Sequence, residues 1–288
     1  MNGDNAPGPN GFTVAFWQNC WEFVKEKVME MFKEFHEPSS FLKSLNTTFL
    51  VLIPKKGGAE DLGDFRPISL EGLYKLMAKV LANKLRKVIG KVVSPDQNVF
   101  VMGKQILDVS LIANKVMQKM GFGSKWLGWM WRCISTAKFL VLVNGVSASF
   151  FPSTKGLRQG DPLSPYLFVM GMEVLSALIR RAVEGGFLSG CKIRGKKVGF
   201  EYFPPFFADD TIVFCEAKKE HLTHLSWTLF WFEAASGLRI NLAKSEIFPV
   251  GEVEEVDVMA VELGCKVGSL PSSYLGLPLG APNKALSV

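Results

Sequence analysis

The stretch GLRQGDPLSPYLFVMGMEVLSALIRRAVE, residues 156–184, joins a polar loop to a long apolar run. Ser164 followed by Pro165 is typical of the first turn of a helix, so we expect a helix from Pro165 to the end of the stretch. The loop could be no more than the cap of that helix, but a cap explains neither Arg158 nor Gln159. A loop bracketed by glycines also lets the backbone approach a nucleotide closely at a helix N-terminus.

Outward from this stretch, helical and strand-like segments are mixed along the chain. Apolar residues recur at helical spacing in several segments, and an Asn-Gly pair at 144–145 predicts a two-residue hairpin turn. The expected helices are 13–36, 73–89, 106–120, 125–134, 165–184 and 218–235. The expected strands are 48–53, 139–143, 146–151, 206–208 and 211–214. This pattern predicts an α+β fold.

The composition is that of a folded, basic protein. Of 288 residues, 48% are hydrophobic and 21% are charged, which predicts a packed core in one large or two small domains. The net charge of +6 suits a polyanionic partner. The five cysteines lack zinc-binding spacing, and neither a signal peptide nor an apolar run of membrane-spanning length is present. We therefore expect an intracellular protein of the nucleus or cytoplasm, not secreted and without a membrane partner.

Two adjacent aspartates, Asp209 and Asp210, lie between apolar strand-like runs. Adjacent carboxylates repel each other, and an apolar setting raises the cost of their charges. A divalent cation would offset that cost because it supplies the opposite charge. Alternatively, the pair is a polar hairpin turn, and in isolation this interpretation is preferred. A later lysine, Lys244, could assist phosphate chemistry, although most lysines only face solvent.

A second basic motif, DFRPISL at 64–70, follows a loop that contains Lys55 and Lys56. The guanidinium of Arg66 is a planar donor fork that suits phosphate oxygens. The alternative is an ion pair between Arg66 and Asp61 or Asp64.

Six motifs occur in one order, and together they resemble the reverse transcriptases of LINE-type (non-LTR) retrotransposons, particularly those of plants. They are APGPNG (6–11), LIPKK with DFRPISL (52–56, 64–70), GLRQGDPLSP (156–165), FADD (207–210), SGLRINLAKSE (236–246) and YLGLPL (274–279). The resemblance covers nearly the whole chain. It implies a right-hand polymerase with fingers over 1–104 and palm over 105–288. The palm would end at a primer grip at 274–280, with the thumb absent or minimal.

The resemblance also implies partners and residue roles. The implied partners are an RNA template, a DNA primer and deoxynucleotide triphosphates, with two Mg²⁺ ions as cofactor. The residues implied in catalysis are Asp209, Asp210 and Lys244, and the two aspartates would bind the metal. Those implied in nucleotide binding are Arg66, Gln159 and Gly160. Those implied in nucleic-acid binding are Lys55, Lys56, Tyr274, Leu275 and Gly276.

One family element has no counterpart in this sequence. The family carries a strand with the first catalytic aspartate before the RQGDP loop, but here Gln118 runs straight into Lys119. The nearest acids, Asp108 and Asp161, do not have the expected surroundings, and Pro204-Pro205 precede the catalytic hairpin. We expect a reverse transcriptase that is catalytically defective. The alternatives are a non-catalytic nucleic-acid-binding remnant and a non-functional pseudogene product.

Overall fold

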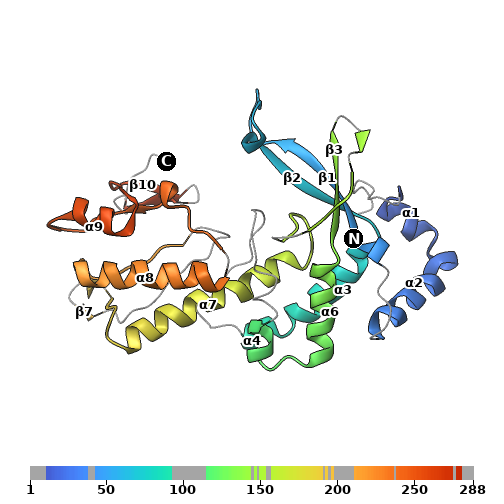
Figure 1. Ribbon diagram of the computed structural model, residues 1–288, viewed down its shortest axis with the longest axis horizontal. Helices are drawn as coiled ribbons and strands as arrows, with labels where there is room; N and C mark the ends of the chain where they lie inside the picture. Colours follow the sequence, from blue (N-terminus) through green and yellow to red (C-terminus); the bar gives the residue numbers. More distant parts are fainter. Residues whose placement is uncertain are drawn as a thin grey trace. The chain divides into compact units, whose positions relative to one another are not determined.

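The computed structural model of the chain mixes helices and short sheets, as an α+β fold requires (Figure 1). It describes residues 11–37, 43–92, 115–143, 146–147, 149–153, 157–190, 192–193, 196–197, 211–236, 238–274 and 277–280. The chain forms two compact units, residues 1–93 with 102–171 and residues 94–101 with 172–288. The expected border between fingers and palm, at residues 104–105, lies outside the described residues.

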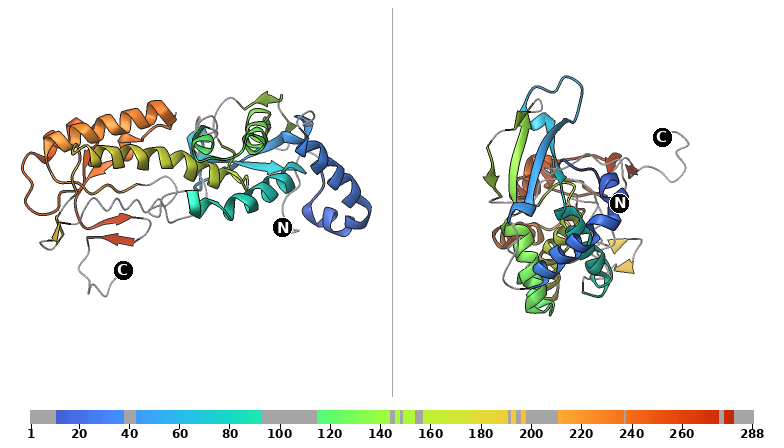
Figure 2. Two further views of the ribbon diagram at one scale, coloured as in Figure 1. Left: turned by 90° about the horizontal axis from the view of Figure 1, so that it is seen from below. Right: turned by 90° about the vertical axis from the view of Figure 1, so that its right-hand side faces the viewer.

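Unit 1 is built on a mixed sheet with strand order β2-β1-β3-β4, and Figure 2 shows its three long strands side by side. β1 (Thr47–Pro54) pairs antiparallel with β2 (Phe65–Glu71) and parallel with β3 (Lys138–Val143). β4 (Val146–Ser147) and β5 (Phe151–Pro152) both pair antiparallel with β3. The strands predicted at 48–53 and 139–143 are thus confirmed, as is the return of the chain after 144–145.

The helices of unit 1 follow the predicted apolar spacing closely. They are α1 (Val14–Asn19), α2 (Trp21–His36), α3 (Tyr74–Arg86), α4 (Ile89–Val92), a helical segment at 115–119 and α6 (Ser124–Ser135), with 3₁₀ turns at Lys43–Asn46 and Leu62–Asp64. The predicted helix at 13–36 is divided because Cys20 leaves the helical region, with φ −91° and ψ 11°. Buried side chains of α3 and α6, among them Met77, Leu85 and Met130, form the core.

The join between Gln118 and Lys119 lies inside the helical segment that ends near Met120. Gly121, at φ +83°, reverses the chain in the left-handed region. The Gly121 N–H donates to Gln118 O at 3.1 Å, and the Phe122 N–H donates to Met117 O at 3.0 Å. These two bonds form a Schellman motif, which satisfies the last carbonyls of the helix. The chain then enters α6 at Ser124, so no strand lies between residues 115 and 135, all of which are described.

Unit 2 contains most of α7 (Ser164–Glu184), which begins in unit 1, and two further helices, α8 (Lys219–Ser236) and α9 (Val256–Leu263). Its short strands pair as β6 (Lys192–Ile193) with β7 (Lys196–Lys197), β8 (Glu246–Ile247) with β9 (Lys266–Val267), and β10 (Ser272–Tyr274) with β11 (Leu277–Leu279). A 3₁₀ turn spans Leu242–Lys244. Within the described ranges, no helix is both long and apolar enough to cross a membrane.

The helices predicted at 165–184 and 218–235 are confirmed, but the strand predicted at 211–214 is wrong. Those four residues belong to no helix or strand. A strand needs a neighbour for its N–H and C=O groups, and no described strand pairs with this segment. The other half of that predicted hairpin, 206–208, lies outside the described residues, as do Asp209 and Asp210.

Candidate functional site

The loop at 157–163 lies along β2, the edge strand of the sheet. The Ser69 N–H donates to Gln159 O at 3.0 Å, so the loop pairs with main-chain groups that an edge strand otherwise leaves open. Gly160 has φ +98°, and a Cβ there would lie 3.6 Å from Ser69 O. The left-handed backbone thus favours glycine at position 160. Two of the predicted nucleotide-binding residues therefore lie against the strand that carries the third.

That third residue, Arg66, is exposed and pairs with Ile53 in the β1–β2 register. Since side chains alternate along a strand, Arg66 and Glu71 lie on opposite faces of β2. Among the described residues, no carboxylate forms an ion pair with Arg66. Asp64, one of the partners considered from sequence, instead pairs with Lys56 at 2.9 Å. The guanidinium thus remains available to an anion.

Lys55 and Lys56 lie just beyond β1, in the connection to β2. The Lys55 ammonium donates to Gly63 O at 2.6 Å, and the Lys56 side chain is 63% exposed despite its contact with Asp64. Both are held near the connection by local contacts, and Lys56 shares its charge with a carboxylate. Of the two lysines predicted to bind nucleic acid, Lys56 thus has its charge partly neutralised by Asp64, whereas the Lys55 ammonium is bound to a neutral carbonyl.

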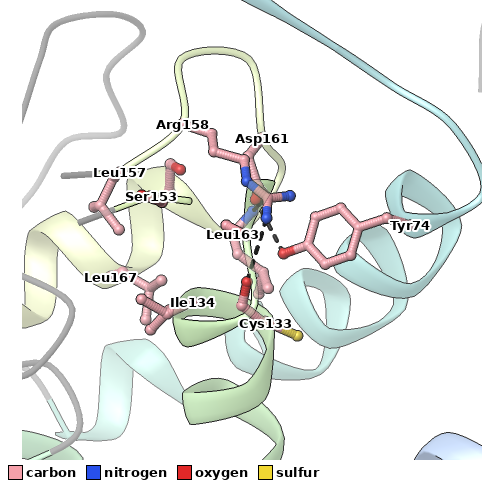
Figure 3. Close-up of a pocket in the computed structure, with 11 residues that line it drawn as sticks. Tyr74, Cys133, Ile134, Ser153, Leu157, Arg158, Asp161, Leu163 and Leu167 are labelled. Atoms are coloured by element: carbon pink, nitrogen blue, oxygen red, sulfur yellow. Dashed lines mark hydrogen bonds between the residues drawn. The ribbon is translucent and has the colours of Figure 1, made fainter. Parts of the chain in front are cut away.

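Arg158 is buried, although its position between two glycines suggests an exposed loop. Its guanidinium lies 4.3 Å from the centre of the Tyr74 ring (Figure 3). One terminal nitrogen, Nη2, donates to Asn46 Oδ1 and to Cys133 O, the latter at 3.4 Å. The other, Nη1, lies 3.6 Å from Glu71 Oε1. Arg158 therefore joins the start of β1, the end of β2, α3 and α6.

Asp161 is buried beside Arg158 and is fully engaged. Its Oδ1 accepts the Leu163 N–H at 2.7 Å, and its Oδ2 accepts the Tyr74 hydroxyl at 3.1 Å. Both oxygens are turned to protein donors and away from solvent. Asp161 therefore does not fit the part of a substitute metal ligand. We call Asn46, Glu71, Tyr74, Arg158 and Asp161 the Arg158 cluster.

The Arg158 cluster contains two buried carboxyl groups but one guanidinium. Burial, followed by the charge of Asp161, raises the pKa of Glu71 to about 8, and Arg158 opposes this rise. Burial also raises the pKa of Asp161, against the charge of Arg158. Near pH 7 the state with one protonated carboxyl is favoured, because a second buried negative charge would lack a partner. We assign that proton to Glu71, since Asp161 accepts two hydrogen bonds that stabilise its charge.

A small cavity of about 20 Å³ adjoins the cluster. Its walls include the side chains of Tyr74, Cys133, Arg158, Asp161 and Leu167 (Figure 3). A cavity of this size holds about one water molecule, whereas small-molecule sites measure roughly 300–1,000 Å³. The cluster thus contacts the loop through buried side chains, and the cavity beside it is too small to bind a nucleotide.

The remaining predicted residues belong to unit 2 and are described within that unit. Lys244 ends a 3₁₀ turn and is exposed. Tyr274 ends β10 in the β10–β11 hairpin, whose turn residues Leu275 and Gly276 lie outside the described residues. In the described ranges, no group of three or more His, Cys, Asp or Glu could hold a metal ion. The predicted ligands Asp209 and Asp210 lie outside those ranges.

Sequence reasoning missed Arg158, Asp161 and Glu71 as a buried unit. One signal was present: a cap for the α7 helix did not account for Arg158. Glu71 lies 87 residues before Arg158 in sequence, and Asn46 lies 112 residues before it. No local sequence pattern could therefore reveal these contacts.

Comparison with known proteins agrees with the motifs. Residues 53–279 match the family described as "Reverse transcriptase (RNA-dependent DNA polymerase)". The chain is 26% identical over 279 residues to the transposon TX1 uncharacterized 149 kDa protein of Xenopus laevis, covering 85% of this chain and 21% of the relative. It is 25% identical over 252 residues to the retrovirus-related Pol polyprotein from type-1 retrotransposable element R2 of Nasonia vitripennis. That match covers 74% of this chain and 23% of the relative.

A third relative is matched over most of its own length but over less than half of this chain. The chain is 35% identical over 116 residues to an uncharacterized mitochondrial protein of Arabidopsis thaliana, covering 40% of this chain and 91% of the relative. The match to the two transposon proteins, by contrast, spans less than a quarter of their lengths. Because the family match extends over most of its length, this chain belongs to the reverse transcriptase (RNA-dependent DNA polymerase) family.

Proposed function

We propose that this chain is the fingers-and-palm region of a plant-like non-LTR retrotransposon reverse transcriptase that lacks the first catalytic-aspartate strand. In this proposal it retains the nucleotide-binding loop and the strand beside it, but it does not catalyse DNA synthesis. One observation carries the proposal: residues 115–119 pass through the Gly121 turn directly into α6, where the family has its aspartate-bearing strand.

The alignments support a loss of residues. The alignment to the TX1 protein runs over 279 residues, although 85% of this 288-residue chain is a smaller number. The R2 alignment runs over 252 residues, again more than 74% of the chain. Both relatives therefore have residues within the aligned stretch that this chain lacks. The 116-residue alignment to the mitochondrial protein has no such excess.

The retained part supports the nucleotide-binding half of the proposal. Ser69 and Gln159 join the RQGDP loop to β2, and Arg66 lies three residues before Ser69, about 10 Å along the strand. An exposed guanidinium and a loop with glycine at the point of closest approach are suited to a triphosphate.

The missing strand accounts for the proposed loss of catalysis. When two Mg²⁺ ions are bound, such an enzyme activates the primer hydroxyl and stabilises the leaving pyrophosphate. Asp209 and Asp210 without a further carboxylate would hold magnesium loosely through water. Asp161 is not a replacement, because Tyr74 and the Leu163 N–H occupy its oxygens.

The test is primer extension on an RNA template with Mg²⁺ and deoxynucleotide triphosphates. The wild-type chain should extend the primer no more than its Asp209→Asn variant does. Robust extension by the wild type that Asp209→Asn abolishes would overturn the proposed defect and would require another carboxylate at the metal site.

A second measurement separates a nucleic-acid-binding chain from an inert one. Exposed basic residues of α3, α4 and the segment between them favour weak binding without sequence preference; they are Lys79, Lys84, Arg86, Lys87 and Lys91. RNA affinity should fall steeply between low and high salt. Affinity that does not change with salt would exclude this electrostatic binding.

A further inference from the structure

We propose that the Arg158 cluster holds the Gln159–Gly160 loop against β2 and thereby sets the position of Gln159 relative to Arg66. Arg158, Asp161 and Tyr74 are then positioning residues for the incoming nucleotide. The nucleotide part of this inference rests on the proposed function, whereas the loop-holding part rests on the geometry of unit 1 alone.

The two loop residues assigned to the nucleotide are fixed at both ends by buried charged side chains. Arg158 directly precedes Gln159, and its guanidinium is buried against Tyr74 and Asn46. Asp161 directly follows Gly160, and its carboxylate accepts the Tyr74 hydroxyl. Between these anchors, the Ser69 N–H donates to Gln159 O at 3.0 Å. The loop therefore has two side-chain anchors and one main-chain contact within four residues.

Tyr74 links the two anchors to each other. The face of its ring lies under the Arg158 guanidinium, while its hydroxyl reaches Asp161 Oδ2 at 3.1 Å. Tyr74 is the first residue of α3, and other side chains of α3 belong to the core. The loop is therefore attached through Tyr74 to a well-packed helix. A shift of Tyr74 would move both ends of the loop together.

The composition of the cluster is unlike that of a site selected for packing alone. Glu71 is buried with both carboxyl oxygens lacking a hydrogen-bond partner, and Arg158 Nη1 also lacks one. Apolar residues of similar volume often stabilise a core as well as a buried ion pair does. The buried polar groups instead point to a requirement for geometry, because the hydrogen bonds from Arg158 to Asn46 and from Tyr74 to Asp161 are directional and apolar contacts are not.

The first test is hydrogen exchange of the full chain carrying Tyr74→Phe. This variant keeps the ring under Arg158 and removes only the hydroxyl that anchors Asp161. Loss of a hydrogen bond to a charged group should speed exchange in a peptide covering 157–163, and at the Ser69 amide, by about tenfold or more. Peptides of α8 should be unaffected. As a control, Lys56→Ala breaks an exposed ion pair at the other end of β2 and should leave the loop unchanged.

A second variant, Glu71→Gln, tests the cluster at constant side-chain volume. In the wild type, exchange of the loop should rise between pH 7 and 9 by more than the intrinsic rate, because ionised Glu71 adds a second buried negative charge beside one guanidinium. In Glu71→Gln this excess should disappear. The charged and titratable groups that face Glu71 are Arg158, Asp161, Tyr74, Lys75 and Cys133. If loop exchange is unchanged by Tyr74→Phe and shows no excess in the wild type, the loop-holding inference is wrong.

Nucleotide binding distinguishes the two proposals. With Mg²⁺ and a fluorescent deoxynucleotide triphosphate as the probe, Arg66→Ala should weaken binding without changing loop exchange. Tyr74→Phe should change both. If the wild type binds no nucleotide, the nucleotide-binding part of the proposed function and the nucleotide part of this inference both fail, while the exchange data still decide whether the cluster holds the loop.

Discussion

The Tyr74 hydroxyl donates to Asp161 Oδ2 at 3.1 Å, which ties the first turn of α3 to the loop before α7. Both groups are buried. The hydrogen bond shows why an aspartate follows Gly160: it receives one donor from a helix start and one from the Leu163 N–H. The stability of this region should therefore depend on the ionisation of the buried carboxyl groups and on how well the cluster is shielded from solvent.

The free energy of unfolding should depend on Glu71 and pH. The pKa of Glu71 is raised from 4.5 to about 8 in the folded chain, mainly by burial. Between those pH values the folded chain holds a proton that the unfolded chain has released, so the contribution of Glu71 to stability falls as pH rises from about 5 to 8. Above the folded pKa this decline levels off. Urea unfolding at three pH values should show Glu71→Gln gaining on the wild type as pH rises. Parallel pH dependences would contradict the assignment.

The Gly121 turn should be sensitive to a single methyl group. Gly121→Ala should destabilise the chain by roughly 1–2 kcal/mol, because an L-residue is strained in the left-handed region. Gly128, inside α6, is the matched control. Neither site has an atom within 4 Å of an added Cβ, and Gly128 has ordinary helical backbone. Gly128→Ala should therefore stabilise by up to about 1 kcal/mol. Urea unfolding measures both, and changes of the same sign would refute the turn geometry.

Substitution of Lys56 and substitution of Asp64, which form one ion pair, should change the affinity for RNA in opposite directions. Lys56→Ala should weaken binding and lower the salt slope by about one unit if the ammonium contacts a phosphate. Asp64→Asn should tighten binding, because it releases Lys56 from its 2.9 Å contact. Lys27→Ala, which breaks an exposed ion pair with Glu30 in α2, is the control and should do neither. Equal affinities of all four proteins would exclude Lys56 from the RNA surface.

The thiol of Cys133 should report the opening of the cluster. Burial, with the charge of Asp161, raises the pKa of Cys133 to about 12, so little thiolate forms in the folded chain. Alkylation by iodoacetamide at pH 8 should modify Cys20, which is half-buried, well before Cys133. Mass spectrometry of the two peptides gives both rates. Tyr74→Phe should speed the modification of Cys133, whereas equal rates at both cysteines in the wild type would show that the cluster is open.

Local chemistry made the regular elements predictable. Pro165 behind Ser164 marked the start of α7 to within one residue, and the pattern around 144–145 marked the turn after β3. The break at Cys20 was not predictable, because both halves of that segment share one apolar spacing. The strand at 211–214 failed for the opposite reason: its residues favour a strand, but a strand also needs a partner, and none of the described strands pairs with it.

The sequence predicted which residues belong to the site better than it predicted their contacts. Motif order brought Gln159 and Arg66 into one hypothesis, and the Ser69–Gln159 bond now gives that hypothesis a physical link. The alternative ion pair of Arg66 with Asp64 is not formed, and Asp64 pairs with Lys56, although Lys56 is more distant from it in sequence than Arg66 is. Only the hairpin register brings Lys56 back beside it.

The Gly121 turn has a consequence for how the chain would fold. A strand inserted in a sheet must find partners far away in sequence, and such contacts slow folding because the intervening loop has to close first. The helical segment at 115–119 and α6 are instead joined through hydrogen bonds that span five residues at most. In the proposed function, where the strand is absent, a local reversal stands in place of that long-range search. This part of unit 1 should then form among the earliest steps of folding.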